Sequence, residues 1–332
     1  MSNETVDPSE LPRVAPGAEF VAERDAIGRP HAVVDGPLLP GTVLCLSHWP
    51  ATNSPPAALA DTSAEIVDRY LALGPAGPEL HLVTNNHFDE DGLFGIWLLL
   101  EQPPPGPLRQ LAVEAAEAGD FFTWSDPSAA KCAIATMAMA DRSTTPFPQI
   151  KRALASPTAG DPSDTIYRAL LPRVPSLLAD PERYSFLWSE PWLVVESDIA
   201  LLDSGEATIT EIAELDLAVV RAPRLLNEMA VYPRTDCTRV LTATEGGCHV
   251  LRYRYETWVN YVSRELPPRV DLRPLLPALE ERESQPGAWR FEGVDPITPR
   301  LYFGNETGAA ASSGIEVDEL VEVLRPRLER LR

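Results

Sequence analysis

Two short apolar runs separated by a helical pattern constrain the fold of this chain most strongly. The runs are Thr42-Val43-Leu44-Cys45-Leu46 and Leu80-His81-Leu82-Val83-Thr84, and both are typical of buried parallel strands. Between them, Ile66, Val67, Tyr70 and Leu71 recur at helical spacing after a capping box, Thr62-x-x-Glu65. A strand, a helix and a strand within about 45 residues predict a right-handed βαβ unit in a parallel sheet.

The remaining patterns predict an α/β domain followed by a smaller α+β domain. We expect an N-terminal arm over residues 1–30, an α/β domain with a parallel sheet flanked by helices over 31–205, and an α+β domain over 206–332. Helical patterns lie near 93–101, 107–118 and 127–140, and residues 142–164 predict a loop or lid. In the second domain, strand patterns at 240–244 and 250–262 flank Glu245-Gly246-Gly247, which predicts an antiparallel hairpin.

The charge and the cysteines limit the partners that we expect. The chain has 332 residues and a net charge of −21, which repels the phosphates of nucleic acids and of anionic lipids. We therefore predict a small-molecule substrate, no nucleic-acid partner and no membrane partner, and leave a homodimer open. The N-terminus lacks a signal-peptide pattern, and the four cysteines show no CxxC spacing, so we predict a reduced, cytoplasmic protein.

Ligand-type side chains gather where the second buried strand ends. The segment reads Asn85-Asn86-His87-Phe88-Asp89-Glu90-Asp91-Gly92 and precedes a predicted helix. On an extended segment alternate side chains share a face, so we expect His87, Asp89 and Asp91 to converge. One imidazole and two carboxylates suit a divalent cation such as Mn²⁺, Mg²⁺, Fe²⁺ or Zn²⁺. The end of a parallel strand is also where open α/β sheets bind their ligands.

Two other structures have a similar pattern of acidic residues before a glycine. A polar turn whose aspartates cap the next helix is a structural alternative, and it stays open. An EF-hand loop beginning at His87 is excluded, because its twelfth position would be Leu98, where a bidentate glutamate is required.

The segment resembles the first motif of a known enzyme family. His87-x-Asp89-x-Asp91-Gly92 is similar to the first motif of the DHH phosphoesterases, which bind a pair of manganese ions. The resemblance implies that His87, Asp89 and Asp91 are metal ligands and that the cofactor is Mn²⁺ or Mg²⁺. The Asp-His-His triplet of that family does not occur in this sequence.

A second segment carries a related resemblance. Ser47-His48-Trp49-Pro50, followed by Asp61-Thr62-Ser63-Ala64-Glu65, resembles the stretches that follow the triplet in the DHH family, but here it precedes the first motif. The whole chain also resembles an uncharacterised bacterial protein family, which implies no activity.

Further candidate residues extend the predicted site. His48 follows the first buried strand, so we expect it on a strand adjacent to that of His87, with the two side chains within about 8 Å. Asp120, after a predicted helix end, and Asp61 are additional candidate metal ligands. Arg264 and Arg269 are candidate substrate-binding groups, because guanidinium groups fork onto phosphate or carboxylate.

Two functions from different classes are compatible with these patterns. One is a metal-dependent hydrolase, for example a phosphoesterase that acts on a small phosphorylated or anionic substrate. The alternative is a non-catalytic ligand-binding or scaffold protein with a degenerate hydrolase-like domain, which the missing triplet favours. No GxSxG elbow and no GxGxxG fingerprint supports a serine hydrolase or a dehydrogenase.

Overall fold

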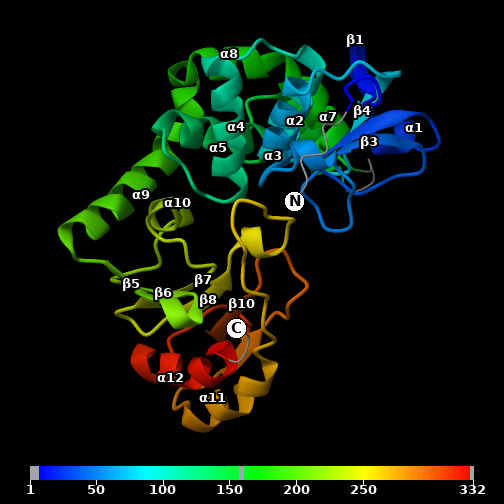
Figure 1. Cartoon of the computed structure of the whole chain (residues 1–332). Coiled ribbons are helices and arrows are strands. Elements are labelled where there is room, and N and C mark those ends of the chain that lie inside the picture. Colours follow the sequence, from blue (N-terminus) through cyan, green and yellow to red (C-terminus); the bar gives the residue numbers. More distant parts are fainter. Residues whose placement is uncertain (1–6, 157–160, 330–332) are drawn as a thin grey trace. The chain divides into compact units, whose positions relative to one another are not determined.

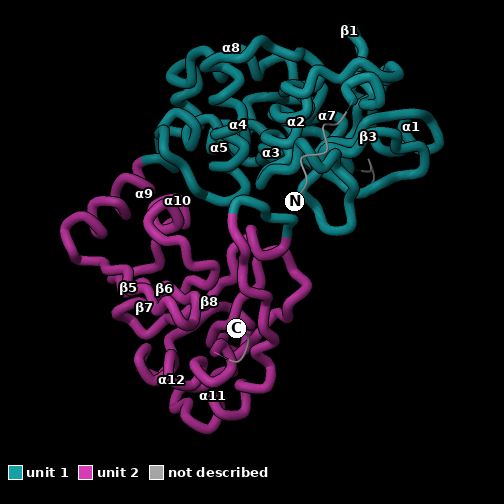
Figure 2. Tube along the Cα trace, viewed as in Figure 1, with its two compact units in different colours: residues 1–192, 259–263 teal, residues 193–258, 264–332 magenta. Residues whose placement is uncertain are grey.

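The computed structural model describes residues 7–156 and 161–329 and is coloured along the chain in Figure 1. These residues form two compact units, which Figure 2 distinguishes by colour. Unit 1 comprises Met1–Trp192 and Val259–Ser263, and unit 2 comprises Leu193–Trp258 and Arg264–Arg332. The protein is α/β, with a parallel sheet in unit 1 and a mixed sheet in unit 2.

The sheet of unit 1 is parallel, as the sequence predicts. Its strands are β1 (Arg13–Phe20), β2 (His31–Val34), β3 (Thr42–Leu46) and β4 (Glu79–Thr84). They lie in the order β1-β4-β2-β3, and each neighbouring pair is parallel. The expectation that β3 and β4 are adjacent is wrong, because the short strand β2 lies between them.

The expectation of a loose arm over residues 1–30 is also wrong for most of its length. Residues 13–20 form β1, and residues 23–26 form the short helix α1 (Glu23–Ala26), while residues 1–6 lie outside the described residues. Gly17 has a φ of +82°, and the pairing with β4 shifts between Val14 and Glu19. This irregularity breaks the period-two pattern that identifies a strand in a sequence.

Helices α2 (Ser63–Ala72) and α3 (Glu90–Glu101) pack against the strands of the unit 1 sheet. Helix α3 is buried over nearly its whole length, which explains why its sequence is apolar all round. Helix α2 begins at a Thr62 cap whose hydroxyl accepts the amide of Glu65, as the capping box predicts. The helices are α2 (Ser63–Ala72), α3 (Glu90–Glu101), α4 (Pro107–Asp120), α5 (Pro127–Ala140), α6 (Pro148–Ala155), α7 (Ser163–Leu170) and α8 (Val174–Ala179), and α9 (Ser185–Ser204) continues into unit 2.

Part of the predicted loop or lid over residues 142–164 is helical. Helix α6 occupies Pro148–Ala155, with its buried Ile150 facing inward. Proline at the first helical position suits a helix start, but proline among serines and threonines is equally typical of a loop. Residues 157–160 of this segment lie outside the described residues.

Unit 2 is built on a mixed sheet in the order β5-β6-β7-β8-β10-β9. The predicted hairpin is confirmed, since β7 and β8 pair antiparallel on either side of Glu245-Gly246-Gly247. Its second arm is shorter than expected, because β8 ends at Tyr253 and a 3₁₀ turn follows over Tyr255–Thr257. The strands are β5 (Thr208–Ile212), β6 (Leu217–Ala222), β7 (Arg239–Thr244), β8 (His249–Tyr253), β9 (Ala288–Phe291) and β10 (Arg300–Gly304).

The two faces of the unit 2 sheet differ in what covers them. Leu251 and Tyr253 of β8 belong to a core that also contains Leu279 of α11 (Leu276–Arg282) and Leu320 of α12 (Val317–Leu328). These two helices lie together on one side of the sheet in Figure 1. Because side chains alternate along a strand, Val250 and Arg252 point to the opposite face, near α10 (Glu228–Val231).

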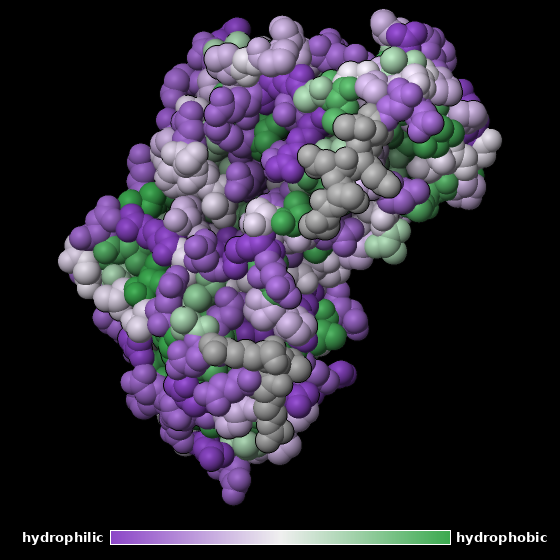
Figure 3. Space-filling model, in the orientation of Figure 1, coloured by the Kyte–Doolittle hydropathy of each residue, from purple (hydrophilic) through white to green (hydrophobic). Residues whose placement is uncertain are grey.

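The surface is mainly hydrophilic, as expected from the many charged residues of the sequence. Hydrophilic residues are spread over the face of the molecule shown in Figure 3, and hydrophobic residues form smaller groups among them. All four cysteines are free thiols. None of the described helices combines the length and the apolarity that a membrane-spanning segment requires.

Candidate metal centre

Acidic and imidazole side chains converge at the carboxyl edge of the unit 1 sheet. Asp35 follows β2 directly, His48 follows β3, and His87 follows β4. Because the strands are parallel, their carboxyl ends open on one edge, where ligands of α/β sheets bind. Asp91 in the first turn of α3 and Asp120 at the end of α4 complete the group.

Asp35 lies between the two histidines. Its Oδ1 is 3.3 Å from Nε2 of His48, and its Oδ2 is 3.3 Å from Nε2 of His87. The hydroxyl of Ser63 also donates to Oδ1. Asp35 is completely buried and has a φ of +50°, a left-handed conformation that aspartate tolerates better than most residues and that occurs often at functional sites.

Each imidazole is oriented by a hydrogen bond on its other nitrogen. Nδ1 of His48 lies 2.6 Å from the carbonyl oxygen of Asp61, and Nδ1 of His87 lies 3.0 Å from the side-chain oxygens of Asn85 and Asn86. An oxygen acceptor at Nδ1 fixes the proton there, so in the neutral form Nε2 carries the lone pair. This is the arrangement in which histidines usually hold metal ions.

The motif at the end of β4 converges by a different route from the one predicted. His87, Asp89 and Asp91 do not alternate along an extended segment, because α3 already begins at Glu90. Asp89 is the N-cap of α3: its Oδ1 accepts the amide of Gly92, and its Oδ2 lies 2.6 Å from Nε2 of His87. The capping alternative is therefore correct for one oxygen of Asp89, and the other oxygen faces the cluster.

Asp91 closes the N-terminus of a neighbouring helix. Its two carboxylate oxygens accept the amides of Ser63 and Ala64, the first residues of α2, each at 2.6 Å. The positive end of the helix dipole favours a carboxylate at this place. Oδ2 of Asp91, which accepts the amide of Ser63, also lies 3.7 Å from Nε2 of His48.

Two sets of side chains have the geometry to hold a cation. Asp35, His87 and Asp89 form one set and Asp35, His48 and Asp91 the other, with one ligand atom from each residue within 4.8 Å of the others. Asp35 is common to both sets. A carboxylate whose two oxygens face two different sets is suited to bridge a pair of ions.

Asp120 and Glu90 add two further carboxyl groups beside these sets. Oδ2 of Asp120 lies 3.6 Å from Nε2 of His48. Glu90 is 6% exposed and packs against Gly119, where an added Cβ would lie 2.6 Å from Cβ of Glu90. Helix α4 continues through Gly119 to Asp120, and the missing side chain of this glycine allows α3 and α4 to approach closely.

The pKa values of the histidines and of Asp35 reflect their mutual attraction. Burial opposes the charged imidazole of His48, but the interaction with Asp35 and the charge of Asp91 raise its pKa to about 9. The pKa of His87 is also raised to about 9, against the effect of burial, chiefly by Asp89. Burial would raise the pKa of Asp35, but His48 and His87 lower it to about 2.

The other carboxyl groups are shifted in the opposite direction. Burial and then the charge of Asp35 raise the pKa of Asp91 to about 7, and burial and then Asp89 raise that of Glu90 to about 8. Burial and the charge of Asp91 raise the pKa of Asp120 well above its usual range. The cluster therefore holds more carboxylates than its two imidazoles neutralise.

In the part of the chain that the structure describes, the carboxyl groups of this cluster have no lysine or arginine partner. Within residues 7–156 and 161–329, no lysine or arginine forms an ion pair with the five carboxyl groups of Asp35, Asp89, Glu90, Asp91 and Asp120. Oδ2 of Asp35 and Oδ2 of Asp120 are buried and make no hydrogen bond to any described residue. Buried charge that is left in this state is costly, so a cation would stabilise the cluster.

Asp61 has a different position from the one expected of a ligand. Its Oδ1 accepts the amides of Val262 and Ser263, at 2.7 and 2.9 Å. Its carbonyl oxygen receives Nδ1 of His48. The structure therefore connects Asp61 to the cluster through the orientation of His48.

The two candidate arginines are engaged elsewhere in the chain. Arg269 donates to the carbonyls of Val294, Pro296 and Ile297 and to the hydroxyl of Thr257. Arg264 donates to the carbonyl of Asp236. These bonds fix both guanidinium groups on the backbone of unit 2, and substrate binding by either arginine stays a prediction.

The sequence prediction missed three participants: Asp35, Ser63 and Glu90. Strand β2 is only four residues long, so the run before Asp35 did not stand out as a strand. The signal that could have found it is the apolar triplet Ala32-Val33-Val34, followed directly by Asp35-Gly36, since each of the other two strands of the cluster also ends in polar residues.

A comparison with protein families places the chain. A model described as a family of unknown function (DUF6687) matches residues 17–328. The chain belongs to this family. No curated protein and no solved structure matches the DUF6687 chain. The matched range includes every residue of the metal-centre cluster, from Asp35 to Asp120.

Proposed function

We propose that this DUF6687 protein is a metal-dependent hydrolase that binds two divalent cations, Mn²⁺ or Mg²⁺, at the cluster around Asp35. The observation that carries the proposal is the shared carboxylate of Asp35, whose two oxygens face His48 and His87. Oxygen ligands and a few imidazoles are the donor set that Mn²⁺ takes in proteins. The resemblance of the His87-x-Asp89-x-Asp91 motif to the DHH phosphoesterases supports the same assignment.

The residues of the site have separate roles in this proposal. His87 and Asp89 would hold one ion, His48 and Asp91 the other, and Asp35 would bridge them. Asp120 adds a carboxylate beside His48. Bound divalent cations lower the pKa of a coordinated water and neutralise charge that develops on a phosphoryl oxygen. A small phosphorylated or otherwise anionic substrate follows from this chemistry.

Hydrolysis and metal binding are tested together on the full-length chain. The metal-free protein is titrated with Mn²⁺ by calorimetry, and release of p-nitrophenol from mono- and bis-p-nitrophenyl phosphate is followed. We expect two bound ions and metal-dependent release that Asp89→Asn lowers by at least tenfold. Glu114→Gln, at a partly exposed acid on α4, is the matched control and should behave like wild type.

Two results would separate this proposal from its alternative. Tight binding of metal without turnover of either ester would favour a non-catalytic binding protein. If the wild-type chain bound no metal, both the proposed divalent-metal cofactor and the proposed hydrolase activity would be ruled out.

A further inference from the structure

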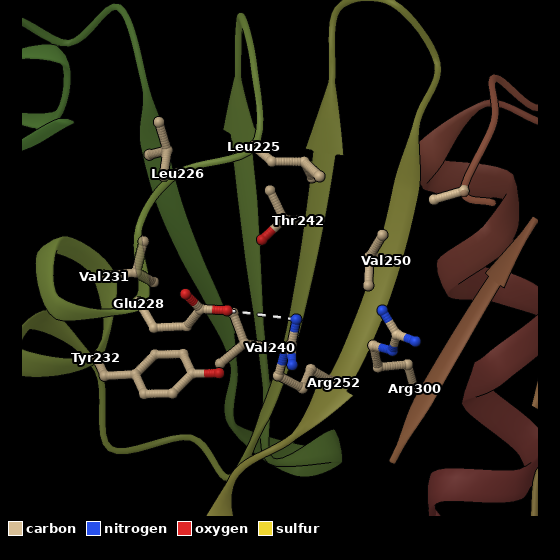
Figure 4. Close-up of a pocket in the computed structure, with 11 residues that line it drawn as sticks. Leu225, Leu226, Glu228, Val231, Tyr232, Val240, Thr242, Val250, Arg252 and Arg300 are labelled. Atoms are coloured by element: carbon tan, nitrogen blue, oxygen red, sulfur yellow. Dashed lines mark ion pairs between the residues drawn. The ribbon is translucent and has the colours of Figure 1, made fainter. Parts of the chain in front are cut away.

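We propose that unit 2 contains a second, separate binding site, which takes a small carboxylic acid with a short apolar chain. The site is a cavity of about 120 Å³ on the face of the unit 2 sheet opposite α11 and α12. Figure 4 shows side chains of the sheet and of the segment around α10 gathered about it. The cavity is smaller than those that take drug-sized ligands, so a molecule of a few carbons fits it better than a nucleotide.

Two arginines stand directly opposite each other in this cavity. Arg252 of β8 and Arg300 of β10 are paired residues of neighbouring antiparallel strands, so their side chains point to the same face. Like charges in this position repel each other. Each arginine is already ion-paired with a glutamate, Arg252 with Glu228 and Arg300 with Glu292, so an anion in this cavity would be held by the remaining guanidinium N–H groups.

Each guanidinium keeps donors that the protein does not use. Arg252 forms an ion pair of 3.3 Å with Glu228, drawn as a dashed line in Figure 4, but donates no hydrogen bond to a described residue. Arg300 uses its Nε and Nη2 on Glu292, and its Nη1 donates to no residue in the described ranges. A carboxylate between the two arginines would accept from both, which is the geometry that guanidinium groups favour.

The other walls of the cavity determine which group the ligand carries beside its carboxylate. Glu228, Tyr232 and Thr242 are polar lining residues, and most of the remaining wall is apolar and comes from both the covering segment and the sheet: Leu225, Leu226, Val231, Val240 and Val250. Leu225 is 47% exposed, which leaves an apolar edge at the cavity. A ligand with a charged end and a branched hydrocarbon end satisfies both parts, because apolar walls contribute affinity only when they cover apolar surface.

The test uses 3-methylbutanoate as the probe, with its neutral amide and inorganic phosphate as comparisons. Calorimetric titration is done on the metal-free full-length chain, so that the acid has no ion to bind in unit 1. We expect saturable millimolar binding of the acid, and binding at least tenfold weaker for Arg252→Gln and Arg300→Gln. Arg252→Lys keeps the positive charge but loses the forked guanidinium group, so its affinity for the acid should lie between those of wild type and Arg252→Gln. This variant replaces Arg252→Gln in the test if the glutamine variant does not fold.

Matched controls connect the result to this cavity. Arg290→Gln removes an arginine from the edge strand β9 outside the cavity, and Asp89→Asn alters the metal centre, so both should bind the acid as wild type does. Equal binding of the acid by Arg252→Gln, or of the amide by wild type, would overturn the proposal. So would phosphate binding as tightly as the acid, since the apolar walls would then contribute nothing.

Discussion

Asp89 and Asp91 are two residues apart, but their carboxylates have different structural duties. Asp89→Asn is expected to weaken Mn²⁺ binding and to leave the metal-free stability equal or higher. Asparagine keeps an oxygen that can accept the amide of Gly92. The substitution also removes an ionisable carboxyl group whose pKa is raised by burial and by the charge of Asp35. The measurement is a melting curve with chelator and then with excess Mn²⁺, where a ligand at a hundred times its Kd adds about 2.7 kcal/mol.

Asp91→Asn should behave differently in the same experiment. Both oxygens of Asp91 accept amides at the start of α2, so the amide nitrogen of asparagine would face a donor. A buried N–H left without an acceptor costs about 1–3 kcal/mol. We therefore expect a lower metal-free melting temperature for Asp91→Asn only. Equal destabilisation by the two substitutions would contradict the separate duties.

His249 predicts a pH dependence that is independent of the metal centre. Its Nε2 lies 2.9 Å from the carbonyl of Ile315, its Nδ1 makes no hydrogen bond to a described residue, and burial lowers its pKa below 6.5. A folded-state pKa below the unfolded value means that the unfolded chain binds the proton more readily. Stability is therefore complete above pH 6.5 and decreases as the pH falls through the window below it.

The comparison with His249→Gln isolates this contribution. Urea unfolding between about pH 5 and 7 should show a wild-type slope steeper by up to about 1.4 kcal/mol per pH unit. The glutamine variant keeps a side-chain N–H for Ile315 but has no proton to gain. Parallel slopes for the two proteins would show that protonation of His249 is not linked to unfolding.

At the scale of elements, the parts that a sequence predicts are those with a local period. The strands before His48 and His87, helices α2 to α5 and the β7–β8 hairpin follow from apolar spacing and turn residues. Strand order does not, because β2 enters between β3 and β4 through pairing between distant residues. Asp35 directly follows this four-residue strand and was missed with it, and so was the carboxylate that lies between the two histidines.

The orientation of His48 depends on a contact that no local pattern reveals. Val262 and Ser263 lie 201 and 202 residues after Asp61 in the chain. The amide of Asn260 also donates to the carbonyl of His48, at 2.7 Å. The carboxylate of Asp61 therefore fastens residues 259–263 to the loop that carries His48.

Two substitutions of Asp61 distinguish a fastening role from metal ligation. One oxygen accepts both amides, so Asp61→Asn retains an acceptor and should keep Mn²⁺ affinity near that of wild type. Asp61→Ala removes it, and we expect a loss of about 1–3 kcal/mol in stability together with weaker Mn²⁺ binding. Calorimetric titration and urea unfolding measure the two effects. If Asp61→Asn weakened Mn²⁺ binding as much as Asp61→Ala, the charge of Asp61 would be the essential property, as in a ligand.

At the scale of the whole molecule, the net charge of −21 complicates any measurement with metal ions. Divalent cations screen the repulsion among surface carboxylates of any strongly acidic protein, and this stabilises the compact state without a specific site. A shift in melting temperature alone therefore does not locate an ion. The division of the chain into two compact units provides a way to do so.

Amide hydrogen exchange should show a different response in each unit. A specific ion stabilises the elements that hold it, so Mn²⁺ should slow exchange at the start of α2, where the amides of Ser63 and Ala64 donate to Asp91. Exchange in β7 and β8 of unit 2 should not change beyond the effect of an equal ionic strength of NaCl. For 3-methylbutanoate we expect the reverse: exchange in β8 should become slower, and exchange at the start of α2 should not change. Uniform slowing of both units by Mn²⁺, also present in Asp89→Asn, would indicate screening of the surface and no specific metal centre.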